Sequence, residues 1–407
     1  MWSAVDPSML MADKKIITKH APVIDEEMEA DYAFTRLNDI RAEMGMTRFV
    51  NSDILKIGAL AHAKYLVAND ESDHYEKLGL EYYVANAPVD RAMKYGYTSK
   101  FVSENLSTKN SGGEDSIKGL FSAIYHRFGF LNPSMNEIGV GIVQDKAKTA
   151  NTAFVYLMGN SDIRELCNGK SFTSSGKYWK PCKDGAFRVE SNKMDRAQKY
   201  SKISNPKIIK YPYAGQENVA PVFYDESPDP LPDYEVSGFP ISIEFNDYYF
   251  DTINISSFKL YNDKGHDVSC ISMDKASDPN SIFSENQFAL FPLERLDYNK
   301  KYTVKISYSS KDKKYSDSWS FATKSFQEKI IEIQQNYVEL ELERNKGYIL
   351  YFKPLTASDY ITNMQFPNNV KVDFIDHNTV RFFAPNESTD AFDMDFGNKK
   401  LHIKLTD

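Results

Sequence analysis

Apolar side chains recur at helical spacing in the first 160 residues. One face of 26–46 and one face of 53–69 are apolar, and Ser52 suits the N-cap of the second segment. Shorter helices are predicted further along, and 138–143 with 153–158 predict two strands of a hairpin. Helices combined with an antiparallel sheet indicate an α+β fold for this region.

The second half of the chain alternates between apolar and polar residues with a period of two. About seven short strands separated by turns are predicted over 236–324, and this spacing is typical of a β-sandwich. Residues 327–407 alternate again, which predicts a small C-terminal β domain.

Two segments lack such periodicity. The absence of periodicity over 1–25 predicts a flexible lead-in. Residues 161–235 are rich in proline and polar residues, which favour an extended linker. The predicted organisation is a lead-in over 1–25, an α+β domain over 26–160, a Pro-rich linker over 161–235, a β-sandwich over 236–324 and a small β domain over 327–407.

The net charge of the chain limits the classes of binding partner that are expected. The 407 residues carry a net charge of -8, which argues against a general binder of nucleic acid or of anionic membranes, because both need a basic surface. Local basic patches are compatible with this balance. No apolar run approaches the ~20 residues of a transmembrane helix. The N-terminus has no basic region followed by an apolar core, so it does not resemble a signal peptide.

The cysteines are compatible with an oxidising or a reducing compartment. Cys167 and Cys182 flank a polar loop. In an oxidising compartment they would form a disulfide, which would stabilise the fold by about 3 kcal/mol in the chain-entropy model, and in a reducing one they would stay free. Cys270 lies in an apolar alternating segment and is predicted to be a buried free thiol.

Short motifs follow one another through the α+β region. They are His74 with Glu76, Pro88-Val89-Asp90-Arg91 leading to Gly96-Tyr97, Ser103-Glu104-Asn105-Leu106, His126-Arg127 and Asn136-Glu137-Ile138-Gly139-Val140-Gly141. In this order they resemble the CAP superfamily, also called SCP-like (cysteine-rich secretory proteins, antigen 5, pathogenesis-related 1), and its bacterial branch in particular. The resemblance covers about residues 28–160. It implies an α–β–α sandwich and export, so we expect a sequence from which the signal peptide has been removed.

The β-sandwich segment carries a second resemblance. Gly238-Phe239-Pro240-Ile241, the stretch from Leu293 to Val304 and Trp319-Ser320-Phe321-Ala322-Thr323 are similar to parts of bacterial Ig-like modules of cell-surface proteins. Together the two resemblances imply a secreted or cell-surface protein.

The CAP resemblance implies a cleft lined by two histidines and two glutamates that can hold a divalent metal such as Zn²⁺. His74 matches the first histidine and His126 the second. Glu104 matches the first glutamate, although Ser103 replaces the glycine that precedes it. Two imidazoles and one carboxylate suit Zn²⁺ with one position open to water, so these three residues are the expected ligands. Alternatively, Glu104 orients a histidine without binding the metal.

The second glutamate has no counterpart, because Ser122-Ala123 stand in its place. Glu76 or Glu81 could replace it in space. Asn105 and Arg127 are expected to support the site, Asn105 through hydrogen bonds to backbone. A structural alternative is a polar brace that joins two helices and a loop without binding any ligand.

Three functions fit these observations. We favour a non-enzymatic extracellular binding protein whose cleft takes a divalent metal or small ligand, with an unknown protein, lipid or small molecule as its partner and no nucleic acid. The second is a metal-assisted hydrolase, with metal on His74 and His126 and Glu104 as general base. The third is an adhesive or structural surface protein whose β modules carry the function. The sequence does not predict the oligomeric state.

Overall fold

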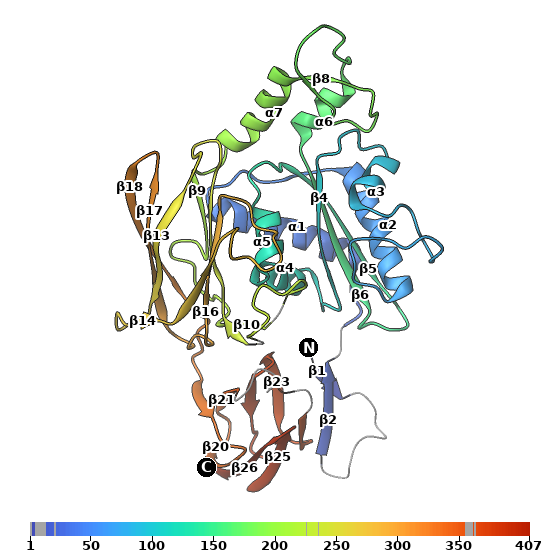
Figure 1. Ribbon diagram of the computed structural model, residues 1–407. Helices are drawn as coiled ribbons and strands as arrows, with labels where there is room; N and C mark the ends of the chain where they lie inside the picture. The colour runs from blue at the N-terminus through green and yellow to red at the C-terminus, as the bar shows by residue number, and fades with distance from the viewer. Residues whose placement is uncertain are drawn as a thin grey trace. The chain divides into compact units, whose positions relative to one another are not determined.

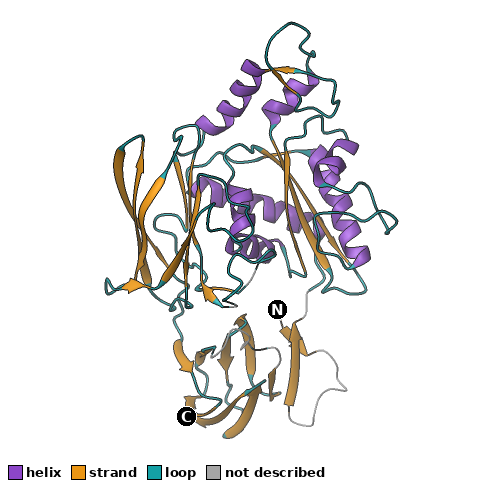
Figure 2. Cartoon of the chain, viewed as in Figure 1, coloured by secondary structure: helices purple, strands orange, loops and turns teal. Residues whose placement is uncertain are grey.

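The computed structural model describes residues 2–4, 14–19, 22–224, 226–234, 236–354, 361 and 364–407. The chain forms two compact units. Val23–Pro232 and Ser237–Thr323 make up the larger unit, and Met1–Pro22, Asp233–Val236 and Lys324–Asp407 the smaller unit. The helices of the described residues all lie in the larger unit (Figure 2). None of these helices is long and apolar enough to cross a bilayer.

A four-stranded sheet forms the centre of the first half of the larger unit (Figure 1). Its order is β3 (Val50–Asn51), β5 (Glu137–Gln144), β6 (Thr152–Gly159) and β4 (Val102–Thr108), with only the β3–β5 pair parallel. Strand β6 is buried on both faces: Ala153, Val155 and Leu157 belong to one hydrophobic cluster and Phe154, Tyr156 and Met158 to another. A strand buried on both faces needs helices on both sides of the sheet.

Five helices supply that cover. The cluster on one face includes residues of α2 (Asp53–Asn69) and α3 (Pro88–Lys94). The cluster on the other includes α1 (Glu26–Glu43), α4 (Gly113–Ser122) and α5 (Ile124–Leu131). This confirms the predicted α–β–α sandwich.

The Gly139-Val140-Gly141 motif explains how closely α2 approaches the sheet. A Cβ atom on Gly139 would lie 2.0 Å from the backbone nitrogen of Lys56, and one on Gly141 would lie 2.3 Å from that of Leu60. Only glycine fits at these two positions of β5.

The segment predicted as a Pro-rich linker, 161–235, is instead built of helices and short strands. They are α6 (Ser161–Asn168), β7 (Tyr178–Trp179), β8 (Val189–Glu190), α7 (Ser191–Ile203), β9 (Ile208–Tyr211) and β10 (Val222–Phe223). Proline density misled the prediction because every proline of the segment lies outside the two helices. Within α7, the buried residues Met194, Ala197 and Ser201 follow helical spacing.

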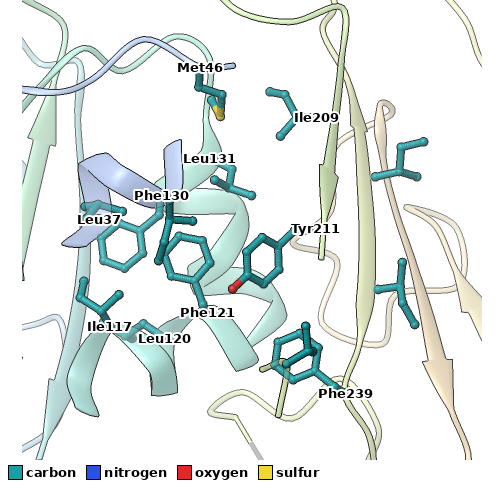
Figure 3. Packing of buried hydrophobic residues seen from close by; sticks show 14 of the residues in the cluster. Leu37, Met46, Ile117, Leu120, Phe121, Phe130, Leu131, Ile209, Tyr211 and Phe239 are labelled. Carbon is teal, nitrogen blue, oxygen red and sulfur yellow. The ribbon is translucent and has the colours of Figure 1, made fainter. Parts of the chain in front are cut away.

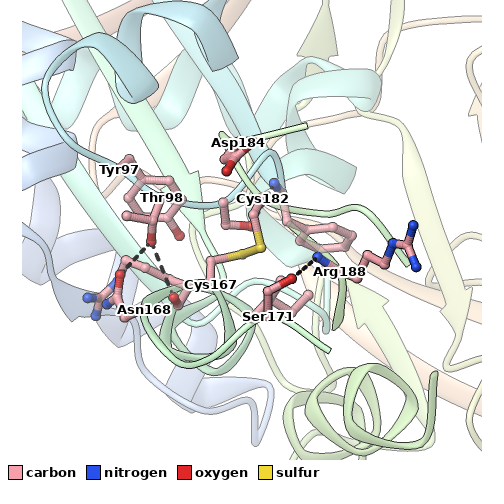
Figure 4. Close-up of a disulfide and its surroundings, with 12 residues drawn as sticks. Tyr97, Thr98, Cys167, Asn168, Ser171, Cys182, Asp184 and Arg188 are labelled. Carbon is pink, nitrogen blue, oxygen red and sulfur yellow. Dashed lines mark hydrogen bonds between the residues drawn. A yellow bond between two sulfur atoms is a disulfide. The ribbon is translucent and has the colours of Figure 1, made fainter. Parts of the chain in front are cut away.

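A disulfide joins Cys167 to Cys182 (Figure 4). Cys182 is buried and pairs with Ser99 in an isolated β-bridge, and the hydroxyl of Thr98 donates to Asn168 Oδ1 at 2.9 Å. The disulfide therefore holds the segment 167–182 next to the start of β4. Cys270 is a free cysteine of intermediate burial, and burial raises the pKa of its thiol to about 12.

Two four-stranded antiparallel sheets complete the larger unit. One contains β15 (Cys270–Met273), β16 (Gln287–Pro292), β12 (Ile241–Phe245) and β9. The other contains β14 (Asp267–Val268), β13 (Asn254–Tyr261), β17 (Lys301–Ser310) and β18 (Lys313–Ala322). Strand β10 pairs separately with β11 (Ser237–Gly238).

The core of these sheets is continuous with that of α1, α4 and α5. The rings of Phe121 and Tyr211 lie 5.0 Å apart, and Phe239 follows Tyr211 at 6.1 Å (Figure 3). The segments predicted as separate domains over 26–160 and 236–324 thus share one hydrophobic core, with β9 of the predicted linker between them.

The described residues of the smaller unit form a core of their own and two sheets. One sheet has the order β1 (Trp2–Ala4), β2 (Lys14–Lys19), β22 (Met364–Pro367), β25 (Ala391–Phe396), β26 (Lys399–Thr406) and β20 (Tyr337–Glu343). The other has the order β19 (Lys329–Ile333), β21 (Gly347–Phe352), β24 (Thr379–Phe383) and β23 (Lys371–Asp376). Parts of the predicted flexible lead-in are thus strands; its remaining residues up to 21 lie outside the described ones.

Candidate functional site

His74 and Glu104 form a bonded pair. His74 Nδ1 lies 2.9 Å from Glu104 Oε1, and Arg91 Nη2 donates to both carboxylate oxygens at 2.9 Å. Glu104 and Arg91 are buried, whereas the His74 side chain is 36% exposed. Burial alone would raise the pKa of Glu104, but the hydrogen bond from His74 and the charge of Arg91 together hold it below its ordinary value. Glu104 is therefore an ionised group that orients the His74 ring.

A second buried pair lies next to the first. His62 Nδ1 is 3.0 Å from Glu76 Oε1, and its Nε2 is 3.1 Å from the carbonyl oxygen of Asp73. Glu76 Oε2 also accepts from the backbone N–H groups of Val84 and Ala85. Glu76 thus ties the loop that follows it to α2, and Glu81 is exposed. Among the described residues, neither carboxylate forms a hydrogen bond or ion pair with His74 or His126.

The carboxylate next to His126 is that of Glu226. His126 Nδ1 lies 2.6 Å from Glu226 Oε1, and the backbone N–H groups of Tyr125 and His126 donate to the same oxygen at 3.0 and 3.1 Å. Helix α5 begins after Ala123, which has no capping side chain. The buried Glu226 carboxylate therefore caps the first turn of α5 and holds the His126 ring at once.

His74 and His126, the histidine pair, lie close together. Their ring centroids are 6.3 Å apart and their planes differ by 24°. Each ring uses Nδ1 toward a buried carboxylate, and no hydrogen bond to either Nε2 is found within the described residues. The His126 side chain is 16% exposed, so both rings keep some access to solvent.

The model of the cysteine-rich secretory protein family, CAP, matches residues 34–159. Those residues are a CAP domain. The histidine pair and Glu104 belong to the CAP domain, whereas Glu226 lies outside it.

Two solved structures are similar to part of this chain. An outer surface protein from Borrelia burgdorferi is 18% identical with a TM-score of 0.30, over 34% of this chain and 98% of that one. An extracellular protein with an SCP domain from Bacillus anthracis is also 18% identical with a TM-score of 0.30, over 36% of this chain and 46% of that one. None of the curated proteins compared with the chain matches it.

The site fits a metal only in part. Within the described ranges, no group of three or more His, Cys, Asp or Glu side chains is placed to hold a metal ion. The structure brings the predicted ligands His74, Glu104 and His126 together, but Arg91 and His74 occupy the oxygens of Glu104. A cation would meet two imidazole nitrogens, each oriented by a carboxylate behind it, which is the usual outer arrangement around metal-binding histidines.

The two predicted supporting residues play different parts. Asn105 Nδ2 donates to the carbonyl oxygen of His126 at 2.6 Å, so it positions this part of α5. Arg127 donates to the carbonyl oxygen of Pro240 at 2.7 Å and lies 4.9 Å from the ring centroids of Tyr211 and Phe239. Burial lowers the pKa of Arg127 to about 10. Arg127 therefore ties the CAP domain to the sheet that contains β12.

Sequence reasoning missed Glu226 and did not include Arg91 among the candidate site residues. Glu226 is 100 residues from His126 and lies in the predicted linker. Once the start of α5 is known, one signal is present: Ala123 precedes the helix where Ser, Thr, Asp or Asn is preferred, so the free N–H groups of the first turn need an acceptor from elsewhere.

Proposed function

We propose that this protein is an exported, non-enzymatic binding protein whose histidine pair takes a divalent metal or a small ligand. The observation that carries this proposal is the pairing of each imidazole, through Nδ1, with its own buried carboxylate. Such a pairing fixes the ring orientation and makes Nε2 a better electron-pair donor. Zn²⁺, when bound, would supply Lewis-acid character and a position for a ligand oxygen.

Binding is favoured over catalysis by the state of Glu104. A general base works best with a pKa near the operating pH and with a free oxygen. The pKa of Glu104 is lowered, after the opposing effect of burial, by His74 and Arg91, and its oxygens already accept hydrogen bonds from these two residues. The hydrolase in which Glu104 acts as base has no observation in its favour.

The disulfide supports the proposed location. Disulfides persist in oxidising compartments and are rare in the cytosol. Cys167 and Cys182 form one in a segment with many exposed residues, which fits a protein that acts outside the cell or on its surface.

Zinc titration by calorimetry tests the proposal. The metal-stripped protein and a His74→Ala/His126→Ala variant are compared with a His266→Ala/His402→Ala control, which removes two histidines outside the CAP domain. We expect roughly micromolar binding by the wild type and the control, weakened at least about tenfold in the first variant because both imidazoles are gone. Equal binding by all three proteins would refute a metal site at the histidine pair.

A further inference from the structure

The segment that contains the disulfide differs sharply in charge from the rest of the chain. Residues 161–210 contain twelve Lys or Arg and five Asp or Glu, so they carry +7 in a chain of net charge -8. Nine of the twelve cations are exposed. The other three, Arg164, Lys202 and Lys210, are the ones that pair with carboxylates. The nine exposed cations form no ion pair within the described residues.

These cations lie on neighbouring elements. Strand β7 pairs with β8, which leads directly into α7, and the N–H of Ser191 donates to the carbonyl oxygen of Lys177 at 3.0 Å. On α7, Arg196 and Lys199 lie opposite the buried face that carries Met194, Ala197 and Ser201. Figure 1 shows α6, β8 and α7 together at one end of the larger unit. We call loop 168–180 and the exposed face of α7 the basic surface.

Cations lie over two of the aromatic rings on or beside this surface. The Arg188 guanidinium lies 4.4 Å from the ring centroid of Tyr178, and Lys199 Nζ lies 5.2 Å from that of Tyr248. Trp179 and Tyr200 are 51% and 64% exposed, and Tyr178 and Tyr248 are 41% and 37% exposed. Rings interspersed with exposed cations do not form the broad apolar face that a bilayer anchor buries, and cations over Tyr178 and Tyr248 leave few ring faces for stacking along single-stranded nucleic acid. Charge is therefore the main recognition feature.

We propose that the basic surface binds an acidic polysaccharide, a linear chain of sugars bearing carboxylate, sulfate or phosphate groups. The 13 residues of α7 extend over about 20 Å, which suits a linear polyanion better than a compact anion. Release of counterions from such a polymer favours binding by several unpaired cations at once. Trp179 and Tyr200 offer flat faces to the sugar rings, and the acidic remainder of the protein confines the polymer to this surface.

Heparin is the probe that tests this site. Its affinity is measured by fluorescence anisotropy at low and moderate salt for the full chain and for Lys193→Gln/Arg196→Gln/Lys199→Gln. We expect the variant to bind at least about tenfold more weakly and with a shallower salt dependence, because three cations no longer release counterions. The matched control, Lys311→Gln/Lys313→Gln/Lys314→Gln, removes as many charges from the turn after β17 and the start of β18 and should bind like the wild type.

Two further measurements complete the test. Trp179→Ala should weaken heparin binding several-fold while leaving the salt dependence unchanged, and far-UV circular dichroism verifies that each variant is folded. Equal weakening in the control variant, or no heparin binding by the wild type at low salt, would overturn the proposal. So would tighter binding to phosphatidylglycerol vesicles or to single-stranded DNA than to heparin. Since none of the substituted residues touches the histidine pair, failure here is independent of the zinc test.

Discussion

Glu226 performs two tasks with one carboxylate, because it holds the His126 ring and caps the first turn of α5. In Glu226→Gln the amide oxygen can still accept a hydrogen bond, but the negative charge is lost. We expect stability to fall by about 1–2 kcal/mol and zinc affinity to fall about tenfold. Thermal unfolding and calorimetry measure the two effects, with the exposed Glu217→Gln as control. A loss of stability with unchanged zinc affinity would show that Glu226 only caps the helix.

Glu244 makes the stability of the larger unit depend on pH. Burial raises the pKa of this carboxyl to about 8, with Gln287, Lys202 and Arg41 opposing the rise. The folded state therefore keeps a proton that the unfolded state releases near its ordinary pKa of 4.5. Since the unfolded state binds fewer protons in this range, the contribution of Glu244 to stability falls as the pH rises from about 5 to about 8 and is then level.

The substitution Glu244→Gln isolates this contribution. A glutamine does not titrate, so the stability of the variant relative to the wild type should increase as the pH rises from about 5 to about 8. Urea unfolding at several pH values measures this difference, in which other titrating groups such as the histidines cancel. A difference that stays constant with pH would show that Glu244 titrates alike in the folded and unfolded states.

At the scale of elements, a Gly→Ala substitution is expected to change stability in opposite directions at two positions. Gly139 of β5 lies against the backbone of α2, where a Cβ would come within 2.0 Å of Lys56 N, so Gly139→Ala should cost at least about 3 kcal/mol. Gly119 of α4 has nothing within 4 Å of its Cβ position, so Gly119→Ala should stabilise the helix by about 1 kcal/mol. Urea unfolding measures both. A harmless Gly139→Ala would contradict the close contact of α2 with β5.

Elements whose pattern is local could be predicted well from the sequence. The stripe over 53–69 coincides with α2, and the hairpin predicted from 138–143 and 153–158 coincides with β5 and β6. Helix α7 was not predicted, although Met194, Ala197 and Ser201 are spaced as on one face of a helix. The prolines on either side of this segment favoured an extended linker instead. The contact of Glu226 with His126 could not be predicted in the same way, since it joins segments 100 residues apart and has no periodicity.

At the scale of the molecule, the CAP domain is completed by the part of the larger unit that follows it. Arg127 reaches the carbonyl oxygen of Pro240, Phe121 packs on Tyr211, and Tyr125 donates its hydroxyl hydrogen to Asp278. One hydrophobic core includes helices of the CAP domain and strands of both following sheets. The histidine pair therefore depends for its geometry on residues that the family motif does not contain.

Two fragments test this dependence. Residues 23–323 keep the shared core and Glu226, so they should unfold in one cooperative transition and bind zinc like the full chain. Residues 23–160 lose Tyr211, the Pro240 acceptor for the buried Arg127, and the cap of α5. Because an unpaired buried cation and an exposed core face are both costly, we expect this fragment to bind a hydrophobic dye and to lose near-UV circular dichroism.

The zinc affinity of 23–160 should fall with its tertiary structure, at least about tenfold, because His126 loses the carboxylate that orients it. Calorimetric unfolding and zinc titration of both fragments distinguish the alternatives. If 23–160 unfolded cooperatively and bound zinc as tightly as 23–323, the CAP domain would be self-sufficient and the contacts of Glu226 and Arg127 would be dispensable. If 23–160 folded but lost only zinc binding, Glu226 would position the histidine without being needed for the fold of the domain.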